Sequence, residues 1–535
     1  MIYINRFFLS IFNRLQQLYL NSNFYDKRIS DIDNSPLTYK PSPHLLSSLI
    51  KYQKKKFKID DFSLRDLWDN KNLSIKEFKN LNSFYWFFSL DLKSSKRTTQ
   101  SVVTNWTKNN FRYNYRSWDF DLTAKRIIAW LSCYGLTYDE SDQNYKNNFN
   151  HIIQKQANHL IYEINRSKLI ENKLIGCASI ILVGLCYQNK NNYLAFGTSS
   201  LKKISKIVLD NNGFPKSRSI KQLIFYLKYF ILIREWFKES QKNIPEHIDE
   251  TIYHLSQAYA FFRINKDTDF LFNGNNISNN EDFDNYLKRM GYKFKNENHE
   301  LGGYIIFKNK KTCLIMDAGP SPNYKHTKDY QSGALSFEIV SGGKKLISNC
   351  GYYKKNNKFN QISKSSAAHS TLVIDDNSSC KFIKVNDFFL TKEDLKIVEK
   401  DSTFEKDYWK ITASHDGYLK KYNSIHERKI EFYPNQMTFI GNDKIIKKKI
   451  NHHYKFDIRF HVEPNVKLMK TQDNKAILIE LQDEGWKFTC ENFDINIDNG
   501  LYFGNKNSYT ENYNIYITGI SNNQIENINW EIKKI

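Results

Sequence analysis

The sequence predicts an α+β protein of at least two domains, in which a helical N-terminal domain precedes an antiparallel β-sandwich. Three observations support this prediction. The chain has 535 residues, which is too long for one ordinary hydrophobic core. Apolar residues recur at helical spacing from about residue 63 to 264, and short strand-like runs follow residue 302. Helices first and strands second indicate separate domains rather than alternating βαβ units.

Three segments of the N-terminal part have clear helical patterns. Residues 149–165 place their apolar side chains on one face, which predicts an amphipathic helix. Residues 174–187 are apolar nearly all round, so we expect a helix buried on both sides. A further long helix is predicted over residues 220–237, after a turn at Asn211-Asn212-Gly213-Phe214-Pro215. Short connections between such helices favour antiparallel α/α packing.

The C-terminal part consists of strand-like runs separated by turn signals. Ser341-Gly342-Gly343 lies between two of these runs and predicts a tight hairpin. Several short strands of this kind are typical of an antiparallel sandwich. The predicted strands cover residues 304–307, 313–316, 335–340, 345–349, 371–374, 456–462, 476–481 and 486–490.

The chain is strongly basic, with a formal net charge of +22, and 15% of its residues are aromatic. Such a charge either belongs to ordinary solvated surface or attracts a polyanion: acidic polysaccharide, nucleic acid or anionic lipid. The lysine runs 54–56 and 447–449 are short, and no nucleic-acid-binding motif is present. Nucleic acid is therefore not an expected partner, while ordinary solvated surface, an acidic polysaccharide and anionic lipid all stay open.

The seven cysteines form no CxxC pair and no cluster with the spacing of metal ligands. Cys133, Cys177 and Cys186 lie in apolar surroundings and are expected to be buried small hydrophobic residues. The sequence also lacks a serine nucleophile elbow, a phosphate-binding loop and a dinucleotide fingerprint. These absences disfavour the corresponding hydrolase, nucleotide-binding and redox classes.

Residues 1–20 carry apolar side chains at helical spacing. The apolar run 7–12 is too short for a signal-peptide core or a membrane span. An amphipathic helix docked on the protein body is the favoured interpretation, and a membrane-surface helix is the alternative. The apolar positions are Phe7, Phe8, Ile11, Phe12, Leu15 and Leu18.

Four short motifs stand in order between residues 313 and 380: Asp317-Ala318-Gly319-Pro320, Leu335-Ser336-Phe337-Glu338, Asn349-Cys350-Gly351 and Ala368-His369-Ser370-Thr371. In this order they resemble the C-terminal domain of the heparinase II/III family of polysaccharide lyases. The likeness is strongest to the proteobacterial members of that family. Segments 118–130, 413–418, 426–428 and 459–461 extend the resemblance to most of the chain.

The resemblance implies an (α/α) toroid followed by the sandwich. The expected domains are residues 1–60, with the amphipathic helix and a basic lead-in, the toroid at 61–285 and the sandwich at 286–535. The family cleaves uronate polysaccharides by β-elimination. A base removes the proton α to the uronate carboxyl, and an acid protonates the leaving oxygen.

The resemblance carries over few of the family's catalytic residues, because the histidine segment of the family's sandwich falls on residues 329–333, where both of its histidines are missing. The remaining catalytic candidates are Asn172, which the resemblance suggests in the toroid, and His326, Tyr330 and His369 in the sandwich. Each has a structural alternative. His369 precedes an apolar strand and is equally well explained as a core histidine bonded to backbone. His326 and Tyr330 are alternatively solvated loop side chains. The tyrosine can act as a base or acid only where nearby cations lower its pKa.

The family holds a structural zinc ion through His, Asp and His, and these positions read Gln331, Asn349 and His369 here. Neutral amides are poor zinc ligands, so we expect no metal and no other cofactor. Gln331 is instead a candidate for contact with substrate.

Arg126, Trp118 and Trp130 are further candidates for substrate binding. The arginine would hold a sugar carboxylate, and the indole rings would stack on the sugar. The alternative is that all three pack between helices and that the arginine is structural.

The favoured function is a carbon–oxygen lyase that cleaves an acidic, uronate-containing glycan in a cleft between the two domains. The alternatives are a catalytically inactive glycan-binding protein and a membrane-surface factor of envelope polysaccharide formation that attaches through residues 1–20. The resemblance predicts the cell envelope or periplasm. The cytoplasm is the alternative, because no secretion signal is legible. The glycan and the oligomeric state stay open.

Overall fold

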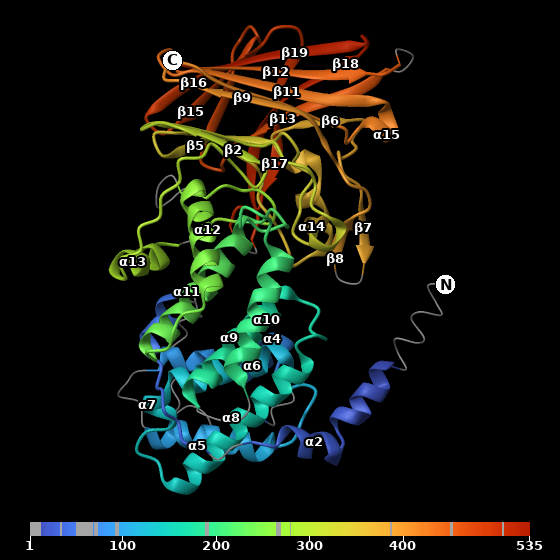
Figure 1. Cartoon of the computed structure of the whole chain (residues 1–535). Helices are drawn as coiled ribbons and strands as arrows, with labels where there is room; N and C mark the ends of the chain where they lie inside the picture. Colours follow the sequence, from blue (N-terminus) through green and yellow to red (C-terminus); the bar gives the residue numbers. More distant parts are fainter. Residues whose placement is uncertain are drawn as a thin grey trace. The chain divides into compact units, whose positions relative to one another are not determined.

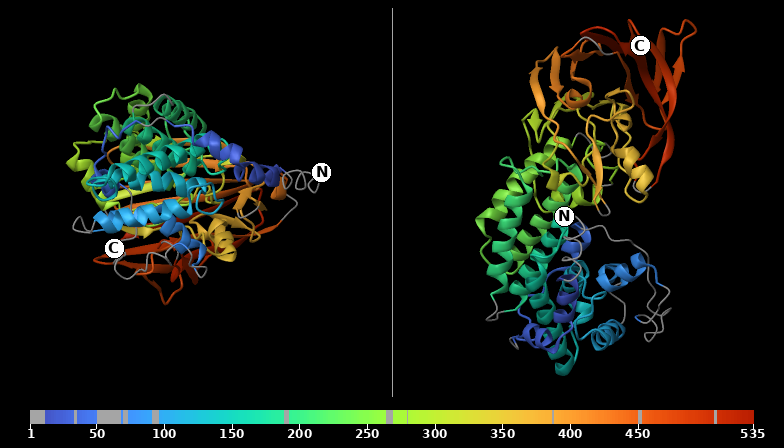
Figure 2. Two further views of the ribbon diagram at one scale, coloured as in Figure 1. Left: turned by 90° about the horizontal axis from the view of Figure 1, so that it is seen from below. Right: turned by 90° about the vertical axis from the view of Figure 1, so that its right-hand side faces the viewer.

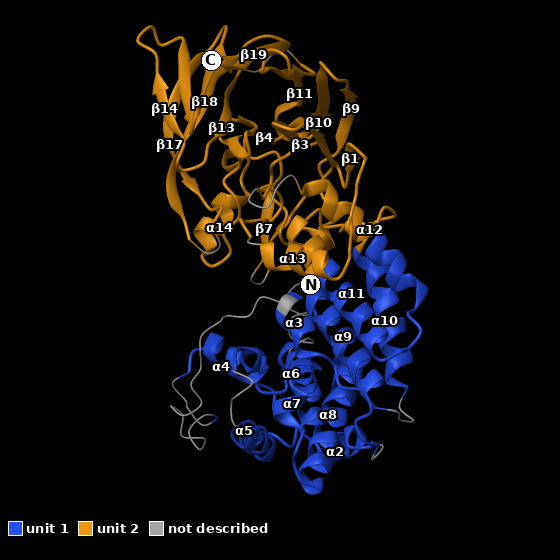
Figure 3. Cartoon of the chain, turned by 90° about the vertical axis from the view of Figure 1, so that its left-hand side faces the viewer, with its two compact units in different colours: residues 1–208, 226–253 blue, residues 209–225, 254–535 orange. Residues whose placement is uncertain are grey.

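The chain forms two compact units (Figure 3), the first of residues 1–208 and 226–253 and the second of residues 209–225 and 254–535. The second unit thus begins before the expected boundary at residue 286, and its residues 209–225 include the start of a long helix. The computed structural model describes residues 12–32, 35–49, 68, 73–90, 96–187, 192–263, 269–278, 280–385, 388–449, 453–505 and 508–535.

The first unit is helical (Figure 1). Its central helix lies against three others, α9 contacting α6, α8 and α10. The apolar run 174–187, which was predicted to be buried all round, forms most of α9. Nearly all side chains of this run are inaccessible to solvent. The helices are α2 (Asn23–Ile29), α3 (Pro43–Leu49), α4 (Ile75–Ser83), α5 (Lys96–Asn109), α6 (Phe120–Ser132), α7 (Tyr134–Thr137), α8 (Gln143–Glu163), α9 (Ile170–Cys186) and α10 (Tyr193–Val208).

Two long helices pass from one unit to the other along the chain. α11 (Ile220–Glu239) begins in residues of the second unit and ends in the first, and α12 (Glu246–Phe262) runs from the first into the second. The second unit also contains the shorter helices α13 (Glu281–Arg289), α14 (Asn357–Lys364) and α15 (Leu419–Tyr422).

The second unit is built on antiparallel sheets. A five-stranded sheet has the order β1-β2-β3-β4-β5, with β1 (Glu300–Leu301), β2 (Tyr304–Lys308), β3 (Thr312–Asp317), β4 (Phe337–Ser341) and β5 (Lys344–Ile347). A four-stranded sheet has the order β17-β18-β13-β6, with β6 (Leu372–Ile374), β13 (Tyr454–His461), β17 (Asp494–Tyr502) and β18 (Thr510–Ser521). β18 pairs antiparallel with both β17 and β13. The strands at the C-terminal end of the chain are the red ones in the right-hand view of Figure 2.

The largest sheet has eight strands in the order β14-β15-β16-β19-β12-β11-β10-β9. They are β9 (Ile397–Phe404), β10 (Trp409–His415), β11 (Ser424–Tyr433), β12 (Thr438–Lys447), β14 (Lys467–Lys470), β15 (Ala476–Leu481), β16 (Glu484–Cys490) and β19 (Ile525–Lys534). A separate hairpin is formed by β7 (Phe382–Val385) and β8 (Phe388–Thr391). Buried and partly exposed side chains alternate strictly along β11, because one of its faces lies on the core.

One hydrophobic core joins the three larger sheets. Phe337 of β4 stacks on Trp530 of β19 at 5.5 Å between ring centroids, and Phe460 of β13 meets the same indole at 5.0 Å. Burial of these large rings stabilises the sandwich through the hydrophobic effect. The predicted order of a helical region followed by an antiparallel β-sandwich is confirmed.

Two local predictions are also confirmed. Gly342 and Gly343 adopt φ angles of 56° and 83° in the turn between β4 and β5, a backbone region that favours glycine. Cys133, Cys177 and Cys186 are buried and unpaired. In the described part of the chain, no helix is both long and apolar enough to cross a membrane.

Candidate functional site

A basic loop surface on the second unit gathers the groups best suited to bind an acidic ligand. It lies on the connection from β3 to β4, where the short 3-10 helix Tyr324–His326 exposes its side chains. The Asn323 side chain accepts a hydrogen bond from Lys325 N and so caps this turn. We define the loop surface as Lys216, Tyr324, Lys325, His326 and Lys328.

His326 is the titratable centre of the loop surface. The side chain is half-buried, and its pKa is lowered first by burial and then by the charges of Lys216 and Lys325. The neutral imidazole is therefore favoured at neutral pH, which is the form that accepts a proton. The two lysines also supply the positive charge that would attract a carboxylate.

Aromatic side chains accompany the cations at this surface. Tyr324 is 43% exposed, and Lys328 Nζ lies 4.8 Å from the centroid of the Phe388 ring. Nearby, the buried Lys364 donates hydrogen bonds to the carbonyls of Lys328 and Tyr330, both at 2.8 Å. Burial lowers the pKa of Lys364 to about 7. Lys364 thus holds the C-terminal end of the loop, at residues 328–330, through these two hydrogen bonds.

A buried arginine anchors the start of the same loop. Arg218 donates to Asp317 Oδ1 at 2.6 Å and to the carbonyls of Gly319 and Pro320, each at 3.1 Å. A methyl group added at Gly319 would lie 2.6 Å from the guanidinium carbon, so glycine is required there. The Asp317-Ala318-Gly319-Pro320 motif therefore supplies the acceptors that bind the Arg218 guanidinium.

Tyr330, a catalytic candidate, is fully buried beneath the loop surface. Its hydroxyl faces Cys380 Sγ at 3.9 Å, and burial raises the pKa of Tyr330 well above its usual value. A base would need the opposite shift. These features support a structural role for Tyr330, and its catalytic role stays a prediction.

His369 is also buried, with 1% of its surface exposed. Its Nδ1 lies 2.9 Å from Ser365 O, and burial lowers its pKa to about 4. The ring packs against Gly333, where an added methyl group would lie 2.6 Å from Cδ2. This environment matches the alternative of a core histidine bonded to backbone.

Gln331 is fully buried and therefore does not reach a substrate in this conformation. Its Oε1 accepts from Gly274 N at 2.9 Å, and its Nε2 donates to Gly351 O at 3.0 Å and Ser363 O at 2.6 Å. The amide thus joins three backbone segments through hydrogen bonds. Both the oxygen and the nitrogen of the amide are therefore hydrogen-bonded, as is usual for buried polar groups.

The residues at the family's zinc positions do not fit a zinc ion. Asn349 donates to Glu338 Oε1 at 3.1 Å and accepts from Ser370 N at 2.9 Å, so both ends of its amide are engaged. The Gln331 amide is likewise engaged. Zinc prefers thiolate, imidazole and carboxylate ligands. Within the described ranges, no group of three or more His, Cys, Asp and Glu side chains is arranged to hold a metal ion.

Arg126, Trp118 and Trp130 are inaccessible to a saccharide, because all three are buried in the first unit. The guanidinium lies 3.9 Å from the centroid of the Trp106 ring and donates to Gln156 Oε1 at 2.8 Å. The structure thus supports the helix-packing alternative for these residues. Asn172 is half-buried in the first turn of α9, and its catalytic role stays a prediction.

Sequence reasoning singled out His326 alone on the loop surface, and it missed the other members of that surface and the two supports, Arg218 and Lys364. Lys216 and Arg218 follow the turn at residues 211–215, about a hundred residues before the loop that Arg218 bonds to and whose His326 the charge of Lys216 affects. A left-handed φ of 60° at Arg218 is the only unusual local feature, and the sequence does not reveal it. Lys364 lies in an ordinary polar helix.

Comparison with known proteins supports the fold. Residues 296–531 match the family model "Heparinase II/III-like, C-terminal". A mutant of the heparan sulfate lyase HepC from Pedobacter heparinus aligns with a TM-score of 0.69 at 12% identity, over 91% of this chain and 85% of that one. A heparinase III crystal structure aligns with a TM-score of 0.67 at 13% identity, over 94% and 86% of the two chains. The heparinase III BT4657 gene product with methylated lysines aligns with a TM-score of 0.69 at 12% identity, over 96% of this chain and 84% of that one. No curated protein matches the sequence.

Proposed function

We propose that this protein binds an acidic, uronate-containing polysaccharide and cleaves it by β-elimination. The observation that carries the proposal is the position of His326, a half-buried histidine whose pKa is lowered in part by two lysines on an exposed loop. The fold similarity to a heparan sulfate lyase and to heparinase III supports a glycosaminoglycan-like substrate.

The loop surface provides the groups that the reaction needs. Neutral His326 accepts the proton α to the uronate carboxyl, and Lys216 and Lys325 neutralise the carboxylate as negative charge builds up on it. The exposed Tyr324 hydroxyl, in the same turn, is placed to protonate the leaving glycosidic oxygen. The C–O bond then breaks, and a C=C bond forms in the new non-reducing end.

Ultraviolet absorbance of the new C=C bond tests this proposal. Purified protein is incubated with a panel of uronate polysaccharides, heparan sulfate among them, with and without a chelator. We expect rising absorbance with at least one glycan, and no change on chelation because we propose that no zinc is needed. Loss of activity and of metal after chelation would overturn the metal-free proposal.

The alternative is a catalytically inactive glycan-binding protein of the same fold. The burial of Tyr330, His369 and Gln331 favours this candidate over a lyase that uses the family's own positions. Calorimetric binding of a glycan without any rise in absorbance would support the binder. Absence of both signals across the panel would overturn both functions.

A second candidate function, attachment to a membrane surface, is favoured by the helix at residues 12–20. Its inner side is docked, since Leu20 is buried and Gln16 bonds to Glu163. Phe12, Leu15 and Leu18 face outward and are 57%, 59% and 70% exposed. The predicted positions Phe7, Phe8 and Ile11 lie outside the described residues. The envelope or periplasmic location that the family resemblance predicts agrees with this proposal, and the cytoplasm is the alternative.

We expect Leu15→Glu and Leu18→Glu each to weaken binding to anionic lipid vesicles by about tenfold or more. Burying a leucine in an apolar phase contributes about 1.5–3 kcal/mol, and each 1.4 kcal/mol is a factor of ten. Vesicle co-sedimentation measures the effect. Val398→Glu, at an exposed position on β9, is the matched control. Equal sedimentation of all four proteins would contradict membrane attachment.

A further inference from the structure

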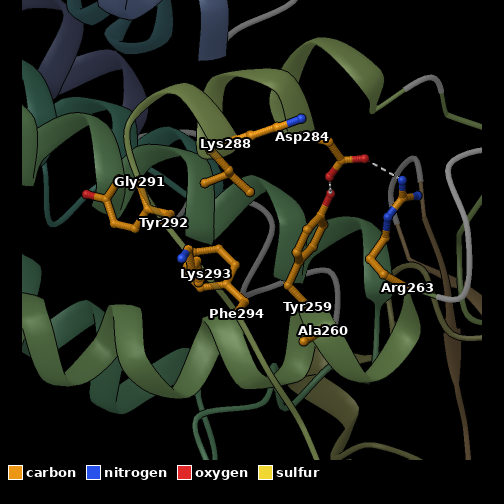
Figure 4. Close-up of a pocket in the computed structure, with 10 residues that line it drawn as sticks. Tyr259, Ala260, Arg263, Asp284, Lys288, Gly291, Tyr292, Lys293 and Phe294 are labelled. Carbon is orange, nitrogen blue, oxygen red and sulfur yellow. Dashed lines mark hydrogen bonds and ion pairs between the residues drawn. The ribbon is translucent and has the colours of Figure 1, made fainter.

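A groove between α12 and α13 in the second unit has the lining of a saccharide site. It has a volume of about 390 Å³, within the range of small-molecule pockets. Tyr259 lines it from α12, Arg263 lines it from the residue after that helix, Lys288 lines it from α13, and the chain that leaves α13 closes it (Figure 4). It is separate from the loop surface and shares no residue with it.

Three aromatic rings form one wall of the groove. The Phe294 ring lies 5.7 Å from the Tyr292 ring and 6.4 Å from the Tyr259 ring, measured between centroids. Tyr292 and Phe294 are partly exposed, and both line the groove. Aromatic faces of this kind stack on the apolar face of a sugar ring and bury its C–H groups.

The single carboxylate of the groove is already neutralised. Asp284 accepts a hydrogen bond from the Tyr259 hydroxyl at 2.5 Å and forms an ion pair with Arg263 (Figure 4). Burial, together with Asp284, raises the pKa of Tyr259, so its hydroxyl stays protonated as the donor. The acidic group therefore adds little repulsion toward an anion.

Two lysines give the groove its net positive charge. Lys288 and Lys293 are exposed at its rim, and across the described ranges neither forms an ion pair. With Asp284 balanced by Arg263, both ammonium groups are available to a carboxylate or sulfate. A neutral sugar would use the aromatic wall but leave these charges unused.

We propose that this groove is an auxiliary binding site for one acidic sugar unit of a polysaccharide chain. The inference rests on the proposed function for the class of glycan, but it requires no catalysis. A chain held at two places binds more tightly, because the second contact forms at high effective concentration. Long acidic glycans therefore gain affinity from the groove.

The experiment compares Lys288→Glu/Lys293→Glu with the wild-type chain by calorimetry, using heparan sulfate chains of defined length. We expect roughly five- to tenfold weaker binding of long chains, the effect of losing two exposed ion pairs. The control is Lys310→Glu, an exposed lysine in the turn between β2 and β3, whose binding should match wild type. Tyr292→Ala should weaken binding similarly, through loss of stacking.

Hydrogen exchange separates this proposal from the proposed function. Protection of peptides covering 284–294 on adding glycan supports the groove, even where no absorbance rises and lyase activity fails. Protection confined to the loop surface, or equal affinity of the double variant and the wild-type chain, would overturn the groove and leave the lyase proposal standing.

Discussion

Replacing His326 with glutamine should reduce the rate of β-elimination by about 10²- to 10⁴-fold, the usual contribution of a general base. Glutamine keeps the size and polarity of the side chain but does not take up a proton at neutral pH. The decrease should fall on kcat, with little change in glycan affinity, because the lysines that attract the carboxylate are retained. Initial rates from ultraviolet absorbance measure it.

The pH profile gives an independent signature of the same residue. The pKa of His326 is lowered by burial and by two lysines, so activity should fall with decreasing pH only below the usual histidine range. Lys216→Ala removes one of these charges and should raise the pKa. The acid limb of the profile would then move to higher pH. A base that is not His326 would leave the limb unmoved.

His369→Ala is the matched comparison at a buried histidine. We expect it to lower stability, because its ring packs against Gly333 and bonds to Ser365 O, while the folded fraction keeps its kcat. His453→Gln, at an exposed histidine, should change neither property. If folded His369→Ala lost activity and His326→Gln kept it, the assignment of the base would pass to His369.

Arg218→Ala should lower the free energy of unfolding of the second unit by about 3–5 kcal/mol, the cost of leaving one member of a buried ion pair unpaired. Asp317 would then be buried without its cation, and the carbonyls of Gly302, Gly303, Gly319 and Pro320 would lose their donor. Urea unfolding measures the loss of free energy, with protease cleavage inside the second unit as the readout of its unfolding.

Two variants test the cause of that loss. Arg218→Lys keeps the charge but has one ammonium group, so it should recover only part of the stability. Lys467→Ala breaks an exposed ion pair with Glu480 in the same unit and should cost less than about 1 kcal/mol. Equal losses for Arg218→Ala and Lys467→Ala would show that the buried pair contributes no more than a surface one.

Local pattern was sufficient for the secondary structure and much of the fold. The all-apolar run at 174–187 gave α9, and the glycine pair at 342–343 gave the β4–β5 turn. Both depend on side chains close in sequence, whose spacing sets which face is buried. The absence of a zinc ion at Gln331 and Asn349 stays a prediction.

Residue roles depended on burial, which periodicity does not reveal. Arg126 and its two tryptophans carry the chemistry of a sugar site, yet all are buried in helix packing. Tyr330 lies in a polar stretch that suggested an exposed loop, yet it is fully buried against Cys380. Side-chain type indicates what a group can do, and only the packing around it decides what it can touch.

The sequence by itself therefore determined a helical region, a β-sandwich and a basic chain suited to an acidic partner. The tertiary structure decided that Arg218 meets Asp317 across 99 residues and that Lys216 lies beside His326. It also decided that one aromatic groove holds a neutralised aspartate and two lysines that form no ion pair with any described residue. These arrangements join segments far apart in the chain, and contacts between such segments form only when the core brings them together.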